Sequence, residues 1–293
     1  MLTSRRGLYF GAVAGVCLAL AGVSLILSAP TAPARIVIST PPVLMIPDRQ
    51  YRGGDSTLLN YDVYAPADYR LVQHPLLIWI HGGGWVIGDK HDWLSVNLAK
   101  KAASLGFVVF DINYRLGTPA KPAPFPAATS DVAAFAAHLK AKLADFNAGE
   151  NPGVSIGGAS AGGQLAMYQA SDPSAPFQYS CVVDMAGLSD LSASDLSKTV
   201  QPLVDGFAPT AALKRAASPL LRLGGIKAKH FLFIHAQDDP IVPLSQSTTM
   251  MQALMRQNVG TSVYGVFPVH GGHDIPSAIS NDAIEGFLQK HCV

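Results

Sequence analysis

The chain has 293 residues, of which 49% are hydrophobic and 14% are charged, with a formal net charge of +1. That length and hydrophobic content suit one large α/β domain with a buried core. Residues 1–34 hold two of the 21 Lys and Arg and none of the 20 Asp and Glu, so the remainder carries 19 minus 20, or −1. A near-neutral domain lacks the basic surface that nucleic acid requires, so we expect no nucleic-acid partner.

The amino terminus has the pattern of an export signal or a membrane anchor. Arg5 and Arg6 precede a strongly apolar run, residues 8–27, that is long enough to cross a bilayer. Small residues follow, but prolines interrupt each candidate cleavage site. We expect residues 1–34 to be a signal peptide or an anchor with a tether. Residues 35–293 are then a periplasmic or extracellular domain, held at the membrane if the segment is not cleaved.

Hydrophobic periodicity predicts alternating strands and helices along the rest of the chain. The predicted strands span residues 57–64, 75–80, 107–110, 154–156, 179–185, 230–235 and 262–267. The predicted helices span residues 92–105, 130–142, 245–257 and 277–290, with another beginning near 164. Continuous apolar strands alternating with helices indicate an α/β fold whose mostly parallel sheet is flanked by helices. Residues 188–223 show no strand pattern, and we interpret this interval as a small helical lid.

Ser160 lies where a strand is followed by a glycine-rich turn and then a helix-forming segment. The pentapeptide Gly158–Gly162 fits GxSxG, the pattern of a nucleophile elbow. In such a turn the two outer positions must be small, and the serine hydroxyl is exposed at the carboxyl end of the strand. By itself the pattern is weak evidence, because a chain with 27 glycines can contain it by chance.

Six motifs together carry a family resemblance: HGGGW at residue 81, NYRL at 113, PFPAATSD at 124, GASAGGQLA at 158, HAQDDPIVP at 235 and GGHD at 271. In their order and spacing the chain resembles the carboxylesterase and hormone-sensitive-lipase-like α/β-hydrolases, close to the small esterase and feruloyl-esterase-like members. The resemblance covers nearly everything after residue 55. It implies an α/β-hydrolase fold, a small-molecule ester substrate, a Ser-His-Asp triad and no cofactor.

The glycine run after His81 suits an oxyanion hole. Ester cleavage develops a negative oxygen that needs preorganised donors, and glycines allow backbone N–H groups to approach closely. We assign this role to the N–H groups of Gly83, Gly84 and Ala161, the residue after the nucleophile. His81 is interpreted as a structural residue that holds the loop.

The serine needs a base, and the base needs a carboxylate to orient it. In the family the order is Ser, then Asp or Glu, then His. Asp239 matches the family's DxxVP pattern, and its neighbour Asp238 is the second choice. Asp184 and Asp190 are third choices, for which helix or turn capping is the preferred interpretation.

Two histidines follow the last predicted strand. His273 fits the GGH pattern and is the predicted base, with His270 as a supporting or surface residue. The remaining histidines are expected to be solvated or satisfied in the core. No group of residues has metal-ligand spacing, so no metal is expected.

Several further residues are expected to support the site. Trp85 and Tyr114 are assigned as walls of the substrate pocket from their positions near the motifs. Asn113, Arg115 and Asp131 are expected to brace the loops, with Asp131 opening a helix. The family often has Asp where this chain has Asn113, and Asp or His where it has Ala159, so the substrate class remains open.

Three cysteines define neither a disulfide framework nor a metal site. A bridge between Cys181 and Cys292 suits an oxidising compartment, but a buried, unreactive thiol is the preferred state of Cys181.

The predicted function is a serine hydrolase for carboxylic esters, with short acyl chains as the default that the resemblance implies. Amide hydrolysis of the arylformamidase or peptidase type is the nearest alternative, because the same triad serves both bonds. A non-catalytic α/β-hydrolase used for binding is a second alternative, although such proteins usually lose a triad member or the glycine loop.

Overall fold

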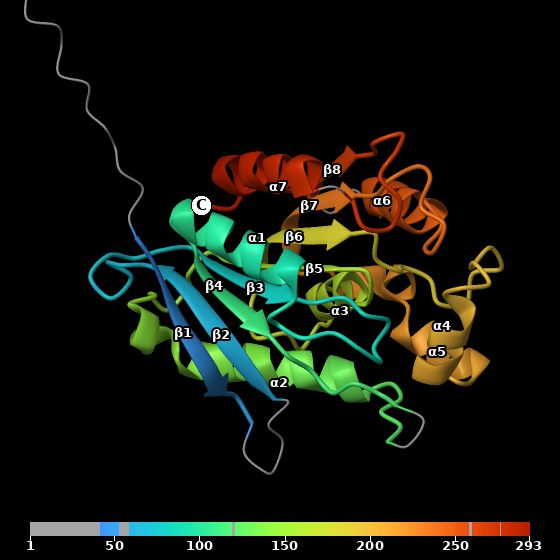
Figure 1. Cartoon of the computed structure of the whole chain (residues 1–293), viewed down its shortest axis with the longest axis horizontal. Coiled ribbons are helices and arrows are strands. Elements are labelled where there is room, and N and C mark those ends of the chain that lie inside the picture. Colours follow the sequence, from blue (N-terminus) through green and yellow to red (C-terminus); the bar gives the residue numbers. More distant parts are fainter. Residues whose placement is uncertain (1–41, 53–58, 119–120, 258–259, 276) are drawn as a thin grey trace, which may run out of the picture. The chain divides into compact units, whose positions relative to one another are not determined.

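The computed structural model describes residues 42–52, 59–118, 121–257, 260–275 and 277–293 (Figure 1). The apolar segment 8–27 and the tether predicted up to residue 34 lie outside the described residues. Among the helices that are described, none combines the length and the apolar character needed to cross a bilayer.

The described part of the chain is built on an eight-stranded sheet with the strand order β1-β2-β4-β3-β5-β6-β7-β8. The strands are β1 (Val43–Gln50), β2 (Asn60–Pro66), β3 (Leu76–Ile80), β4 (Val108–Ile112), β5 (Val154–Ala159), β6 (Tyr179–Met185), β7 (Ala228–Ile234) and β8 (Ser262–Val266). At one edge, β1 pairs antiparallel with β2, and β2 pairs antiparallel with β4. The six strands β3 to β8 run parallel to one another. The predicted, mostly parallel sheet is therefore confirmed.

Helices cover both faces of this sheet because the buried strands carry apolar side chains on alternate sides. Ile78 packs in the cluster that contains Phe135 of α2 (Ala127–Ala141), and this cluster also takes side chains from α3 (Ala161–Ala170) and α6 (Ser245–Gln257). Trp79 packs in the opposite cluster, with side chains from α1 (Trp93–Ser104) and α7 (Ser277–His291). In Figure 1, α1 and α7 accordingly lie together on one side of the sheet.

The interval 188–223 is helical in part. It contains α4 (Gln201–Phe207), α5 (Ala211–Ala217) and most of the 3-10 helix η2 (Pro219–Gly225); another short 3-10 helix, η1, spans Leu143–Phe146. The interval is tied to α6, since the N–H and hydroxyl of Ser189 both bond to Gln246, at 2.9 and 2.6 Å. Its function as a lid stays a prediction.

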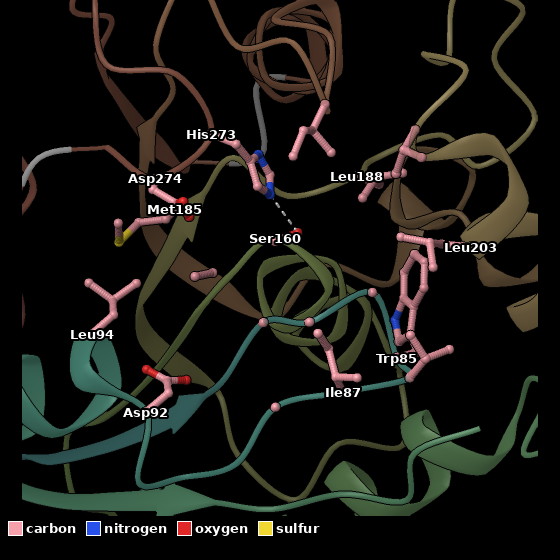
Figure 2. Close-up of a pocket in the computed structure, with 18 of the residues that line it drawn as sticks. Trp85, Ile87, Asp92, Leu94, Ser160, Met185, Leu188, Leu203, His273 and Asp274 are labelled. Carbon is pink, nitrogen blue, oxygen red and sulfur yellow. Dashed lines mark hydrogen bonds between the residues drawn. The ribbon is translucent and has the colours of Figure 1, made fainter. Parts of the chain in front are cut away.

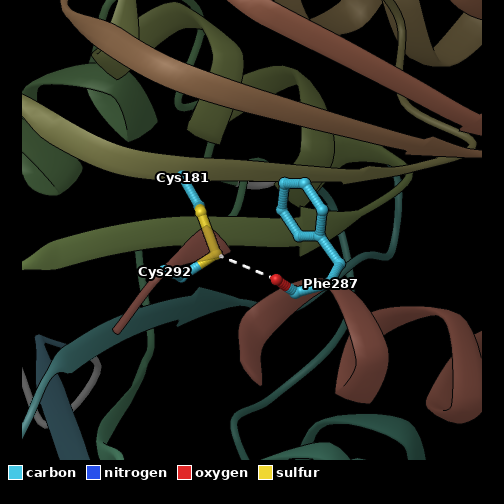
Figure 3. Close-up of a disulfide and its surroundings, with 3 residues drawn as sticks. All are labelled: Cys181, Phe287 and Cys292. Carbon is cyan, nitrogen blue, oxygen red and sulfur yellow. Dashed lines mark hydrogen bonds between the residues drawn. A yellow bond between two sulfur atoms is a disulfide. The ribbon is translucent and has the colours of Figure 1, made fainter. Parts of the chain in front are cut away.

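A disulfide joins Cys181 on β6 to Cys292 just after α7, with Cα atoms 5.6 Å apart (Figure 3). The preferred interpretation of Cys181 as a free thiol is therefore wrong. The reason lies in the packing: α7 crosses the sheet beside β6 and β7, which brings its end to Cys181 although the sequence separation of the two cysteines is 111. The carbonyl oxygen of Phe287 lies 3.6 Å from Sγ of Cys292, which in the disulfide has no hydrogen to donate.

The parallel strands point their carboxyl ends to one edge of the sheet. The glycine loop follows β3, Ser160 follows β5, Asp239 lies beyond β7 and His273 lies beyond β8. In an open α/β sheet this edge is where ligands bind, so the fold gathers the predicted site residues at one place.

Candidate active site

Ser160 occupies the turn between β5 and α3. Its backbone has φ 53° and ψ −118°, a conformation that residues with a side chain rarely adopt. Its N–H donates to the Met185 carbonyl at 2.7 Å, and its own carbonyl accepts from the Gln164 N–H at 3.1 Å. A Cβ on Gly162 would lie 2.1 Å from the carbonyl oxygen of Ile80. One on Gly158 would lie 2.6 Å from the same oxygen. Both flanking positions must therefore be glycine, and the strained turn presents the hydroxyl at the sheet edge.

The structure brings the three predicted triad residues together. Oγ of Ser160 lies 2.9 Å from Nε2 of His273 (Figure 2). Nδ1 of His273 lies 2.8 Å from Oδ2 of Asp239. The other oxygen of Asp239 accepts the N–H groups of Ile241 and Val242, at 2.8 and 3.0 Å. Burial alone would raise the pKa of Asp239, but the hydrogen bonds from His235 and His273 hold this pKa well below its usual value. The acid of the constellation is therefore a carboxylate.

The second-choice residues pair with each other instead of joining this constellation. Nδ1 of His270 lies 3.2 Å from Oδ2 of Asp238, and the His270 side chain is 87% exposed. The other oxygen of Asp238 accepts the N–H groups of Gly271 and Gly272, at 3.0 and 2.8 Å. These hydrogen bonds, above all the one from Gly272, lower the pKa of Asp238. Asp238 thus holds the loop that carries His273.

The third-choice carboxylates lie elsewhere. Asp190 accepts bonds from the N–H and hydroxyl of Ser192, at 2.8 and 2.6 Å, as a turn-capping residue does. Asp184 is fully buried on β6, opposite Gly158 of β5. It lies under the elbow, since a Cβ on Gly163 would be 2.2 Å from its Oδ1. Burial raises the pKa of Asp184 to about 7, against opposing effects from His235 and the Gly187 N–H.

The glycine loop lies directly against the elbow. A Cβ built on Gly82 would be 3.5 Å from Cβ of Ser160, so the loop backbone and the nucleophile are neighbours. Gly83 has φ +103° and Gly84 has φ +59°, values that favour glycine. Ala161 is the first residue of α3, where a backbone N–H has no acceptor within the helix and the helix dipole favours negative charge. The three predicted oxyanion donors therefore come from segments that meet at Ser160.

His81 and Tyr114 support this loop from below. The His81 ring stacks on Tyr114 at 4.5 Å, and its Nδ1 lies 2.7 Å from the Gly82 carbonyl oxygen. Burial lowers the pKa of His81, which keeps the ring neutral. The Tyr114 hydroxyl donates to the His81 carbonyl at 3.2 Å, and the residue is 1% exposed. The assignment of Tyr114 as a pocket wall is therefore wrong: its side chain lies beneath the loop and is not among the described residues that line the cavity.

The bracing residues act around this loop as well. Asn113 accepts the Lys90 N–H at 2.7 Å and donates to Asp89 at 2.7 Å, so it fixes the segment that follows the glycines. Arg115 forms a two-point ion pair with Asp131, at 2.7 and 2.8 Å. Asp131 lies one turn inside α2, because that helix begins at Ala127 and not at the predicted residue 130.

A cavity of about 830 Å³ opens above Ser160. Figure 2 shows Trp85, Leu203 and Leu188 on one side of the serine and Leu94, Met185, Asp92 and Asp274 on the other. Among the described residues that line it, two are aspartates and none is Lys or Arg. Trp85 is a pocket wall as predicted: its ring stacks on Phe207 at 4.4 Å, and its N–H donates to Gln164 at 3.1 Å.

One group of described side chains lies close enough together to share a metal ion, namely Asp48, Asp62 and His91. The buried ammonium of Lys90 already lies among them, 2.9 Å from each of the two carboxylates and 2.7 Å from Nε2 of His91. A cation is thus supplied by the chain itself at this position.

Two contributors to the site were missed from the sequence. The sequence indicates for Gln164 only a place in a helix-forming segment, yet its side chain accepts from Trp85 and donates to the Ala217 carbonyl at 2.9 Å. For His235 the sequence predicts a solvated or core-satisfied histidine, yet its Nε2 lies 3.2 Å from Oδ2 of Asp239. The spacing of four residues between His235 and Asp239 within HAQDD was the available signal.

Comparison with known proteins finds a matching family model and relatives that are named as esterases. The BD-FAE family model matches residues 61–254. Esterase LipQ of Mycobacterium tuberculosis is 27% identical over 236 residues, which cover 73% of this chain and 55% of LipQ. Carboxylic ester hydrolase LipN of the same organism is 40% identical over 126 residues, covering 41% of this chain and 27% of LipN. The chain thus spans about half or less of the length of these curated relatives.

Solved structures agree on the fold. A truncated carbohydrate esterase from gut microbiota superposes with a TM-score of 0.71 at 19% identity, covering 84% of this chain and 95% of the other. Esterase B of Lactobacillus rhamnosis superposes with a TM-score of 0.68 at 22% identity, covering 85% and 86%. At these identities the likeness establishes the fold, which is that of the α/β-hydrolases.

Proposed function

The chain belongs to the BD-FAE family, and from this membership and the geometry at Ser160 we propose that it is a serine hydrolase that cleaves carboxylic esters. The observation that carries the proposal is the continuous set of contacts from Ser160 through His273 to Asp239, at 2.9 and 2.8 Å, beside a glycine loop and beneath a largely apolar cavity. The names of the relatives, which are esterases and a carboxylic ester hydrolase, support the same class of substrate.

The proposed reaction follows from these positions. Oγ of Ser160 attacks the ester carbonyl while Nε2 of His273 takes the hydroxyl proton. The Asp239 carboxylate stabilises the resulting imidazolium, and the N–H groups of Gly83, Gly84 and Ala161 donate to the developing oxyanion. The alcohol leaves with the proton from His273, which yields an acyl-serine. Water then attacks the acyl group by the same route and releases the carboxylic acid.

The cavity favours esters with an apolar acyl part. Leu94, Met185, Leu188 and Leu203 present hydrocarbon surface to both sides of Ser160. We propose short acyl chains as the substrates, in line with the family resemblance, and a volume of about 830 Å³ leaves room for an alcohol part as well.

The test compares the wild type with Ser160→Ala on nitrophenyl acetate, butyrate and octanoate. We expect turnover by the wild type and a loss of about a thousandfold or more in the variant. The decline of kcat/KM along the series then measures the acyl length that the cavity accepts. Equal, negligible rates for both proteins on every ester would contradict the proposal. Matched anilides, run in parallel, would then distinguish amide hydrolysis from a binding protein without catalysis.

We further propose that the protein is exported, with residues 8–27 as signal or membrane anchor. Two observations support this: the apolar run that follows Arg5 and Arg6, and the disulfide between Cys181 and Cys292, which is typical of proteins outside the reducing cytosol. Fractionation of cells that express the full chain, with immunodetection of residues 35–293, tests it. Recovery of the protein only in the cytosolic fraction would contradict export.

A further inference from the structure

His235 lies behind the acid of the site, at the carboxyl end of β7, and its side chain is completely buried. Its N–H donates to the Val266 carbonyl at 3.1 Å, which continues the pairing of β7 with β8. The backbone of this histidine is therefore fixed by the sheet, as the backbone of Ser160 is fixed by the elbow.

Three contacts define how the His235 ring is held. Nδ1 lies 2.8 Å from the hydroxyl oxygen of Ser247 on α6. Nε2 lies 2.9 Å from the carbonyl oxygen of Val242 and 3.2 Å from Oδ2 of Asp239. Both neighbours of Nε2 are acceptors, so Nε2 must carry a hydrogen, and the Ser247 hydroxyl can then donate to Nδ1. The single Nε2–H is thus shared between the Val242 carbonyl, at 2.9 Å, and Oδ2 of Asp239, at 3.2 Å, the oxygen that also accepts the N–H of His273.

This arrangement completes the bonding of Asp239. Its Oδ2 receives His273 and His235, and its Oδ1 receives the N–H groups of Ile241 and Val242. A carboxylate offers about four lone-pair positions, and all four meet a donor here. The side chain of Asp239 is 0% exposed, so water does not replace a donor that is lost. Burial opposes ionisation of Asp239, and the His235 hydrogen bond is the largest of the effects that favour it.

From this geometry we propose that His235 is a positioning residue of the reaction, which fixes Oδ2 of Asp239 midway between two imidazoles. The four residues then form a continuous chain of contacts, Ser160 to His273 to Asp239 to His235. The reacting proton moves only between Ser160, His273 and the substrate, and Asp239 stabilises the imidazolium. His235 keeps the carboxylate charged and prevents it from turning away from His273. The inference rests on the proposed ester hydrolysis and adds a fourth residue to it.

The surroundings of His235 contain two carboxyl groups. Asp239 is the one in contact, and Asp184 on the neighbouring strand β6 acts on it through space. The hydroxyl of Ser247 is the polar group that α6 contributes. Loss of the His235 donor concentrates the Asp239 charge on His273, which stabilises the imidazolium. The acid limb of the kcat/KM profile therefore moves to higher pH.

The experiment compares His235→Leu, which lacks a donor, with His235→Gln, whose side-chain amide offers an N–H near the position of Nε2. For His235→Leu we expect kcat on nitrophenyl butyrate to fall about 10- to 100-fold, the size expected for a lost hydrogen bond to a charged group, with KM nearly unchanged. In this variant the acid limb of the kcat/KM profile moves to higher pH. His235→Gln recovers most of kcat and keeps the wild-type limb.

His230→Leu is the matched control. His230 lies on β7, five residues before His235, with its ring near that of His291, so the same substitution should leave kcat and the acid limb unchanged. Titration of active sites with a nitrophenyl phosphonate corrects every rate for the fraction of folded enzyme.

Three results overturn the proposal: wild-type kcat per active site in His235→Leu, an acid limb that does not move, or the same loss in His235→Gln as in His235→Leu. Failure of ester hydrolysis itself is recognised separately, because the wild type would then be inactive on every ester.

Discussion

Asp238 and His270 form a contact of 3.2 Å immediately beside the 2.8 Å contact of Asp239 with His273. The two pairs come from adjacent or nearly adjacent residues of the same two loops, and they differ in burial. The Asp238 side chain is 43% exposed and that of Asp239 is 0% exposed. Only the buried pair reaches Ser160, and the exposed pair holds the loop between His270 and His273.

This difference predicts the outcome of two matched substitutions. Asp239→Asn removes the charge that stabilises the imidazolium and should lower kcat by about a thousandfold or more. Asp238→Asn keeps an oxygen that can accept from Gly271 and Gly272, and a surface pair contributes little, so its loss should be less than about fivefold. Steady-state kinetics on nitrophenyl butyrate measure both values. A comparable loss of kcat in the two variants would contradict the assignment of Asp239 alone as the acid of the triad.

The glycine loop allows a second comparison within one motif. In Gly83→Ala the new Cβ would lie 2.0 Å from the backbone oxygen of Ile87, so the loop must move. A misplaced oxyanion donor should lower kcat by about 100-fold or more. In Gly84→Ala the nearest atom is the flexible end of Leu203, at 2.7 Å, and we expect a loss of only about tenfold, from backbone strain at positive φ. A larger loss in Gly84→Ala than in Gly83→Ala would contradict this order.

The acyl length that the enzyme prefers should depend on Leu203, which forms one wall of the cavity. Leu203 and Trp85 line both the main cavity and a neighbouring one of about 330 Å³. Leu203→Ala should join the two spaces and move the best substrate from short esters toward octanoate. Trp85→Ala should do the same but should also destabilise the protein by about 3 to 5 kcal/mol, because a buried, stacked ring is lost. An unchanged ratio of octanoate to butyrate turnover in Leu203→Ala would rule out this wall as the limit.

The disulfide should contribute strongly to stability. For a sequence separation of 111 between the two cysteines, the chain-entropy model gives about 4 to 5 kcal/mol for the bridge. We expect the free energy of unfolding of the double variant Cys181→Ala/Cys292→Ala, measured by urea denaturation, to be lower than that of the wild type by this amount. A reducing agent should lower the midpoint of the wild type and leave the double variant unchanged. Equal midpoints for the oxidised wild type and the double variant would show that the bridge is dispensable.

Asp184 predicts a pH dependence of stability with a definite sign. In the native protein its pKa is raised to about 7 from 3.8, so between these pH values the folded state holds a proton that the unfolded chain has released. The free energy of unfolding therefore falls as the pH rises through this range, and levels off above about pH 7. The total decrease in the free energy of unfolding over this pH range is on the order of 4 kcal/mol.

Asp184→Asn keeps the shape of the side chain and removes the titration. Relative to the wild type, the variant should gain stability between pH 4 and pH 8, as measured by urea unfolding at each pH. A difference between the two proteins that stays constant over this range would contradict the assignment. Asp239 does not interfere with the comparison, because it is present in both proteins.

Much of this molecule could be predicted because its signals are local. The apolar runs of β3 and β7 and the elbow at Ser160 carry their structure in short stretches of sequence. The edge strand β1 was missed because most of its residues are exposed on both faces, so no apolar alternation marks it. Long-range proximity was equally invisible, as the bridge from Cys181 to Cys292 depends on where α7 packs.

The site shows the same division. Ser160, Asp239 and His273 follow from motif and chain order, since parallel strands bring their ends together. Tyr114 was misplaced because its sequence neighbours do not reveal on which side of the loop the ring lies. His235 was undervalued because a histidine at a strand end is ordinary until the turn of Asp239 brings the two side chains within 3.2 Å.

The charge of the cavity has a consequence for turnover. Asp92 and Asp274 are lining residues, and no Lys or Arg balances them among the described residues of the wall. A neutral ester enters without an electrostatic penalty, but the acid formed by hydrolysis ionises at neutral pH. If the proposed hydrolysis takes place, we expect the newly formed anion to be repelled by the two carboxylates, so that product inhibition is weak.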